Sequence, residues 1–174
     1  NKEHSYLYID VGGGSTELTF FNAGKLVFKE SFNIGTIRLL KGLVEDKHWD
    51  ELKDFLKLNT KGLNDIIAIG SGGNINKVFS LSKRKDGKPL SLDLLRDYHK
   101  EFSSFSLEDR MKNYKLREDR ADVIVPALQI YINVMRWTDT EEIFVPKIGL
   151  ADGLVHMLYD EVKAKKLDAS TVVL

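Results

Sequence analysis

The sequence predicts an α/β fold whose sheet opens with three antiparallel strands. Three short segments rich in β-favouring residues follow one another at 6–11, 16–21 and 25–33, and turn residues separate them. Apolar residues at helical spacing begin near residue 36, and a further short strand is predicted at 65–69. A run of strands that passes into alternating helices and strands is typical of an α/β fold.

The remaining elements are assigned from periodicity and from residues that start or stop helices. Thr36 is expected to cap the first helix, and the helix at 90–105 is expected to begin through Ser91 and Asp93. Pro126 is expected either to kink the helix at 121–137 or to lie in its first turns. Helices are predicted over 36–43, 46–58, 90–105, 121–137 and 149–166, and a last strand over 142–145.

Composition narrows the class of protein. The 174 residues include 26 Lys and Arg against 26 Asp and Glu, so the formal net charge is zero, which argues against bulk attraction to nucleic acid or to a membrane. The chain has no cysteine, which rules out disulfides and fits a reducing compartment. No apolar run of spanning length and no signal-peptide pattern is evident, so we expect one cytoplasmic domain.

A glycine loop joins the first two predicted strands. Asp10 ends the first strand, where open α/β sheets place their ligands. The three glycines that follow allow backbone torsions closed to other residues, so their N–H groups can converge on an anion. Two hydroxyls are expected to add donors, and a second carboxylate follows. The candidate ligand residues of this loop are Asp10, Gly12, Gly13, Gly14, Ser15, Thr16 and Glu17.

The residues after the glycines exclude two common kinds of phosphate site. A Walker loop needs Lys-Ser or Lys-Thr opening a helix, and a dinucleotide fingerprint needs a helix after the glycines, whereas a strand follows here. A glycine hairpin between two carboxylates instead suits a phosphate chain bound together with Mg²⁺, which takes oxygen ligands. The alternative is a tight hairpin that has acids beside it by chance.

A second glycine turn follows the strand at 65–69 and leads into a helix. Such a helix start offers free N–H groups and a favourable dipole to an anion. Ile75 stands where a dinucleotide fingerprint needs its third glycine, so that motif is excluded. The alternative is an ordinary strand-to-helix turn.

Basic residues recur between 106 and 120, interspersed with acids. A charge run of this kind is usually a solvated surface, and the alternative is contact with a polyanion, for which Arg120 is the strongest candidate. The four histidines are scattered along the chain, which argues against a zinc site or a histidine-based triad.

Five segments in order carry a family resemblance: 10–18 (DVGGGSTEL), 31–39 (SFNIGTIRL), 68–74 (AIGSGGN), 119–126 (DRADVIVP) and 149–154 (GLADGL). Together they resemble the exopolyphosphatase and guanosine pentaphosphate phosphohydrolase family, which belongs to the actin, heat-shock chaperone and sugar-kinase superfamily. The resemblance implies a ribonuclease H-like lobe: a mixed sheet, antiparallel in its first three strands, with helices on both faces. It covers the second of two lobes that face each other across a cleft. Residues 1–174 are therefore expected to be a single domain, the C-terminal lobe, with the N-terminal lobe absent from this chain.

The resemblance also implies an activity. The parent protein is expected to release terminal phosphate from inorganic polyphosphate, or the 5′ phosphate from guanosine pentaphosphate, with Mg²⁺ as cofactor. Asp10 would hold the metal directly or through water, and Glu17 would orient the metal or the attacking water. The glycine loop would bind phosphoryl oxygens. The remaining substrate contacts implied are Gly70, Ser71, Gly72, Gly73 and Arg120.

The general-base glutamate of the family lies in the other lobe, so this chain alone is expected to be inactive. Two-lobed relatives often pair, which makes a homodimer a further expectation. The residues leave polyphosphate and guanosine pentaphosphate undistinguished. Two other classes stay open: an ATP-dependent lobe of the sugar-kinase type, and a non-catalytic sensor that binds polyphosphate or guanosine alarmones.

Overall fold

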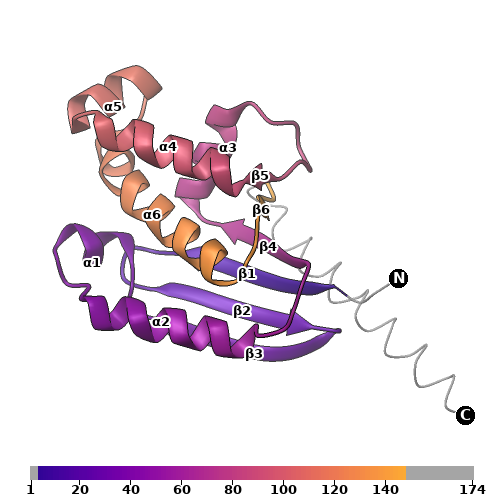
Figure 1. Cartoon of the computed structure of the whole chain (residues 1–174). Coiled ribbons are helices and arrows are strands. Elements are labelled where there is room, and N and C mark those ends of the chain that lie inside the picture. The colour runs from indigo at the N-terminus through magenta and orange to yellow at the C-terminus, as the bar shows by residue number, and fades with distance from the viewer. Residues whose placement is uncertain (1–3, 148–174) are drawn as a thin grey trace, which may run out of the picture.

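The described part of the chain folds around a six-stranded mixed sheet (Figure 1). A computed structural model describes residues 4–147. The first three strands pair antiparallel, and the first, fourth and sixth run parallel, so the predicted α/β class with its antiparallel opening is confirmed. In sheet order the strands are β3 (Lys25–Phe32), β2 (Thr16–Asn22), β1 (Ser5–Val11), β4 (Ile66–Ser71), β6 (Glu142–Phe144) and β5 (Leu90–Ser91).

The strands follow from residue alternation and turn chemistry. Along β1, Leu7 and Ile9 are fully buried, whereas Asp10 is turned away from the core and is exposed. Between β2 and β3, Ala23 and Gly24 have φ values of 51° and 77°. Positive φ at both central residues is the type I′ hairpin turn, whose twist matches the flanking strands.

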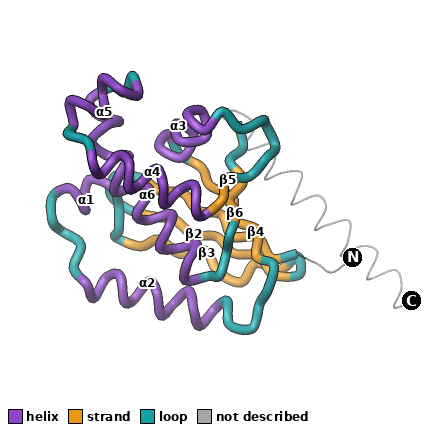
Figure 2. The backbone as a smooth tube through the Cα atoms, turned by 45° about the horizontal axis from the view of Figure 1, so that its top comes forward, coloured by secondary structure: helices purple, strands orange, loops and turns teal. Residues whose placement is uncertain are grey.

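Helix α6 lies at the centre of the helical layer and contacts the other five helices and β1. Figure 1 shows α2 and α6 on the same side of the sheet, and Figure 2 shows α4 and α5 beyond α6, away from α2. Phe55 of α2 packs on Phe28 of β3, with ring centroids 4.8 Å apart. The six helices among the described residues are α1 (Thr36–Leu40), α2 (Asp46–Asn59), α3 (Gly73–Ser82), α4 (Leu92–Ser104), α5 (Leu107–Tyr114) and α6 (Glu118–Trp137).

Two predicted helix starts can be compared with the structure. The cap of α4 is confirmed, because the Ser91 hydroxyl accepts from the N–H of Leu94 at 3.0 Å. The cap of α1 is wrong: Gly35 is its N-cap, and Thr36 is already inside the helix with its side chain buried.

Other differences have local causes. Pro126 lies inside α6, beyond the first turns. The short helix α5 was not predicted, because its residues are mostly polar and its start is marked only by Ser106. Arg110 on that helix donates to the carbonyls of Phe102 and Ala121, so it joins α4 to α6 instead of facing solvent.

The predicted helix at 149–166 lies outside the described residues. Within residues 4–147, no helix has the length and apolar character that a membrane crossing requires.

Candidate functional site

The site lies where β1, β2 and β4 meet at the end of β1. Asp10 is paired in register with Glu17 on β2 on one side and with Ser71 on β4 on the other. Because β1 and β4 are parallel, both end at this edge, and both predicted glycine segments start there. The sheet register therefore brings together the two segments that the sequence marked separately.

Asp10 and Glu17 form a pair of carboxylates across the β1–β2 hairpin. Directly opposed residues of antiparallel strands have Cβ atoms roughly 5 Å apart and lie on the same face. Partial burial of the Asp10 carboxyl raises its pKa above the usual range, and the charge of Glu17 raises that pKa further. A divalent cation between the two carboxylates would relieve this repulsion.

The pair of carboxylates suits a Mg²⁺ site with few protein ligands better than a metal site in which the protein supplies every ligand. Within residues 4–147, no three His, Cys, Asp or Glu side chains gather in a way that could hold a metal. Mg²⁺ is commonly bound by one or two carboxylates and completes its shell with waters and substrate phosphates. Asp10 and Glu17 supply that number of protein ligands.

The carbonyls of the glycine loop all face the start of α1. Each accepts at least one hydrogen bond from that segment, which fixes the orientation of three successive peptide groups. The bonds run from Thr36 N–H to Gly12 O at 3.0 Å, from Ile37 N–H to Gly13 O at 2.9 Å, and from Arg38 Nε to Gly14 O at 2.7 Å.

The N–H groups of the same peptides point the other way, because C=O and N–H are opposed in a trans peptide. They belong to Gly13, Gly14 and Ser15, and none of them donates to a described residue. Three neighbouring donors on the side of the loop away from α1 are the arrangement that binds anions.

The predicted reason for the three glycines is wrong, because none of Gly12, Gly13 and Gly14 has a positive φ. Close packing accounts for two of them. A Cβ on Gly12 would lie 3.3 Å from the carbonyl oxygen of Ser15, and a Cβ on Gly13 would lie 3.0 Å from Cγ1 of Ile37. The glycines therefore let other atoms approach the loop closely.

Gly35 is a site residue to which sequence analysis gave no role. A Cβ on Gly35 would overlap the carbonyl oxygen of Gly13 and would lie 2.6 Å from the carbonyl carbon of Gly14. The glycine loop thus rests directly on the backbone at Gly35. The only sequence signal was that Gly35 falls within a family-like segment.

The hydroxyls of the loop play different parts. Thr16 is fully buried and donates to the carbonyl of Ile34 at 2.6 Å, so it ties β2 to the segment before α1. The Ser15 carbonyl accepts from the N–H of Gly12 at 2.9 Å and closes the loop. Only the Ser15 hydroxyl stays without a bond among the described residues.

The second glycine turn lies beside Asp10. Gly72 has a φ of 129°, which favours glycine, and a Cβ there would lie 3.9 Å from Oδ1 of Asp10. Gly70 is buried, and a Cβ on it would lie 2.7 Å from Cδ1 of Ile143. The structure therefore places Gly72 next to the carboxylate and Gly70 in the packed core.

Tyr131 of α6 supports this turn through its hydroxyl group. Its hydroxyl donates to the carbonyl of Ser71 at 2.7 Å. Burial raises the pKa of Tyr131, and the charge of Asp10 raises it further, so the hydroxyl stays protonated and keeps donating. The ring of Tyr131 is buried in the core, and its hydroxyl is the part that bonds the turn.

Arg120 reaches the second glycine turn from α6. A Cβ on Gly73 would lie 2.9 Å from Cζ of Arg120, so the guanidinium lies directly against that glycine. Its guanidinium makes no ion pair or hydrogen bond with the residues described. At the start of α3, the carbonyl oxygen of the buried Asn74 side chain also lacks a partner among residues 4–147.

We predict that Gly73→Ala weakens binding of tripolyphosphate about tenfold, the value of one charge-assisted hydrogen bond. The added methyl group would displace the end of Arg120, which is flexible, so the melting temperature should change little. Titration calorimetry and thermal unfolding measure the two effects.

Arg120→Ala is the matched variant. If Gly73→Ala acts by displacing the guanidinium, the double variant binds no more weakly than Arg120→Ala alone. A double variant that binds much more weakly would show that the methyl group itself blocks the turn.

Comparison with known proteins gives a family and a fold. The model of the Ppx/GppA phosphatase family matches residues 1–163. The type II variant of the Aquifex aeolicus Ppx/GppA phosphatase superposes with a TM-score of 0.69 at 21% identity, covering 89% of this chain and 57% of that chain. An exopolyphosphatase from Cytophaga hutchinsonii gives 0.63 at 22% identity, with 91% and 58% covered. At these identities the structural likeness shows the fold alone.

The chain spans just over half the length of these structures. No curated protein matches it in sequence.

Proposed function

The chain belongs to the Ppx/GppA phosphatase family, and from this we propose that it is the phosphate-binding lobe of a Mg²⁺-dependent phosphohydrolase. The parent protein would release terminal phosphate from inorganic polyphosphate, or the 5′ phosphate from guanosine pentaphosphate. The observation that carries the proposal is the glycine loop. Its carbonyls accept hydrogen bonds from the start of α1, its N–H groups at 13–15 have no partner among residues 4–147, and it joins the strands on which Asp10 and Glu17 are paired.

Each part of the site has a role that phosphoryl transfer requires. Such transfer depends on positioning and charge neutralisation more than on covalent chemistry from the protein. The N–H groups of Gly13, Gly14 and Ser15 would hold phosphoryl oxygens. Asp10 and Glu17 would hold Mg²⁺, which when bound neutralises phosphoryl charge.

The second glycine turn and Arg120 would contact the substrate from the other side of Asp10. Gly72 and Gly73 lie at the start of α3, whose first N–H groups have no partner within the helix. Arg120 adds a guanidinium that can bind two phosphoryl oxygens at once. Gly70 and Ser71, the last residues of β4, would contribute by positioning the backbone of this turn.

The facing lobe completes the site in this proposal. This chain covers 56–58% of the matched Ppx/GppA structures and the exopolyphosphatase from Cytophaga hutchinsonii. The family resemblance implies that a glutamate of the facing lobe is the general base. We therefore expect the chain by itself to bind phosphate chains and not to turn them over.

The test is phosphate release by the protein with the facing lobe joined before this chain. Long-chain polyphosphate, guanosine pentaphosphate and ATP are offered with and without Mg²⁺, beside Glu17→Ala. We expect Mg²⁺-dependent release from one of the first two substrates, at least about 100-fold slower in the variant. Glu30→Ala removes an exposed carboxylate from neighbouring β3 and should leave release unchanged.

Three results would contradict the proposal. Phosphate release at the same rate with and without Mg²⁺ would show that the metal is not required. Binding of polyphosphate with no release from any substrate would favour a sensor. Use of ATP alone would favour a lobe of the sugar-kinase type.

A further inference from the structure

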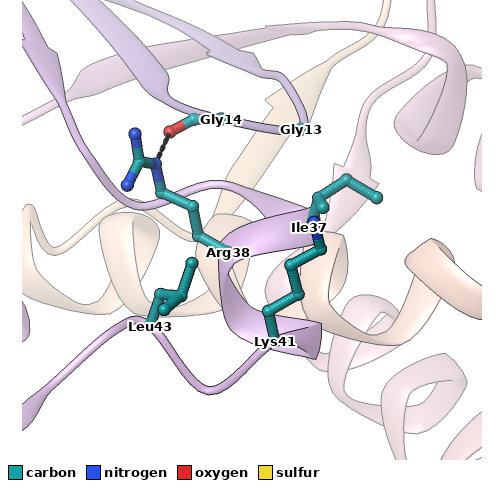
Figure 3. Close-up of a pocket in the computed structure, with 6 residues that line it drawn as sticks. All are labelled: Gly13, Gly14, Ile37, Arg38, Lys41 and Leu43. Carbon is teal, nitrogen blue, oxygen red and sulfur yellow. Dashed lines mark hydrogen bonds between the residues drawn. The ribbon is translucent and has the colours of Figure 1, made fainter.

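A cavity of about 420 Å³ opens on the α1 side of the glycine loop (Figure 3). It therefore lies on the carbonyl side of the loop, opposite the free N–H groups. Two of its six lining residues are basic and none is acidic. The lining residues are Gly13, Gly14, Ile37, Arg38, Lys41 and Leu43.

The two cations of this cavity keep donors free. Arg38 uses Nε to hold the Gly14 carbonyl, and its two terminal nitrogens make no hydrogen bond with a described residue. Lys41 is exposed, and its ammonium group forms no ion pair or hydrogen bond within residues 4–147. In Figure 3 both side chains extend toward the loop end of the cavity. Two cations that line one cavity, with no acidic residue in its lining, attract an anion.

Apolar side chains flank the cations. Ile37 and Leu43 are large hydrophobic residues that stay 41% and 54% exposed. Figure 3 shows Leu43 beneath Arg38. Long basic side chains commonly lay their aliphatic stems along apolar surface and keep the charged group in water. Ile37 and Leu43 supply such surface in the lining of this cavity.

The cavity and the anion-binding face of the loop are separated by a single peptide group. The carbonyl of Gly14 and the N–H of Ser15 belong to the same peptide, so Arg38 bonds one edge while the other edge is free. An anion oxygen on that N–H would lie roughly 8 Å from Arg38 Nε, which is one peptide width plus a hydrogen bond on each side. A single phosphate on that N–H cannot reach Arg38, whereas a chain of phosphoryl groups that passes round the loop can.

We propose that Arg38 and Lys41 form a second subsite that binds the inner phosphoryl groups of a chain whose end lies on the glycine loop. The subsite would give this lobe a preference for chains of three or more phosphoryl groups over orthophosphate. The inference rests on the proposed function only in taking the loop at 12–16 as the phosphate site.

Titration calorimetry of the 174-residue chain with Mg²⁺ tests the subsite, using tripolyphosphate and orthophosphate as probes. Lys41→Gln is expected to weaken tripolyphosphate binding about fivefold, the usual size of one exposed ionic contact. Orthophosphate binding should stay within about twofold, because that ligand does not reach Lys41. Lys41→Arg should restore the tripolyphosphate affinity.

Lys57→Gln is the matched control. It removes the same charge from the last turn of α2, outside the cavity, and is expected to bind both probes like the parent chain. Because the Lys41 side chain is exposed and has no partner within residues 4–147, its replacement should leave the melting temperature unchanged. The salt dependence of tripolyphosphate binding should also become weaker in Lys41→Gln and not in Lys57→Gln.

Two results overturn the subsite: equal tripolyphosphate affinity in Lys41→Gln and Lys57→Gln, or no binding of tripolyphosphate by the parent chain. Failure of the hydrolase proposal is a separate readout, since it concerns phosphate release by the two-lobed protein. Chain-length preference without turnover would uphold the subsite and reject the hydrolase.

Discussion

Gly35→Ala is expected to lower the free energy of unfolding by about 3 kcal/mol, the upper range for overpacking a fixed core position. The new Cβ would overlap the Gly13 carbonyl oxygen and lie 2.6 Å from the carbonyl carbon of Gly14. These are backbone atoms, and the N–H groups of Thr36 and Ile37 bind the same loop, so neither side can move away alone. Urea denaturation followed by circular dichroism measures the change.

Gly14→Ala separates this steric effect from the general cost of replacing a glycine. A Cβ on Gly14 meets nothing within 4 Å, so its free energy of unfolding should change by less than about 1 kcal/mol. An unchanged denaturation midpoint in Gly35→Ala would mean that the loop does not rest on Gly35 in solution.

Asp10→Asn is expected to reduce Mg²⁺-dependent phosphate release by the two-lobed protein about 1,000-fold, as loss of a charged group that holds the metal would. The variant should also be slightly more stable to heat at neutral pH. Burial and the charge of Glu17 both disfavour the ionised Asp10, and the neutral amide removes that cost. Thermal unfolding and a phosphate-release assay on the same preparation measure both effects.

The raised pKa of Asp10 also sets two opposite pH dependences. The ionised carboxylate is the metal ligand, so Mg²⁺ affinity should fall as pH drops through this pKa, which lies above the ordinary 3.8. The contribution of Asp10 to stability runs the other way: it is present below 3.8 and is lost as pH rises through the folded-state pKa.

Asp10→Asn should show neither the pH dependence of Mg²⁺ affinity nor the pH dependence of stability that the Asp10 carboxyl causes. Asp54→Asn changes an exposed position on α2 and is the control; it should keep both pH dependences. A loss of stability in Asp10→Asn at neutral pH would contradict the carboxylate repulsion.

Local residue patterns were sufficient to predict the first three strands of the sheet. Alternation along 5–11 and 16–22 and the turn at Ala23 and Gly24 depend only on neighbouring residues, and the three strands formed as predicted. The sequence also placed Asp10 and Glu17 on either side of the glycine hairpin, and the structure adds that they are paired in register.

The roles of Gly35, Arg38 and Tyr131 were beyond sequence reasoning. Tyr131 bonds Ser71 from 60 positions away, and Arg38 bonds Gly14 from 24 positions away. Such contacts exist only once the sheet order is set, and no residue pattern encodes them. The helix α5 was missed because it is short and buries none of its residues fully, so the apolar spacing of Leu107, Met111 and Tyr114 gave only a weak pattern.

The bonds between the glycine loop and α1 also bear on the thermodynamics of ligand binding. Glycines lose more conformational entropy on ordering than other residues, and here folding itself already fixes the peptides at 12–14. Binding of a phosphate chain therefore carries no further entropy cost for ordering the loop. Affinity then depends mainly on how well the donors replace the hydration of the anion.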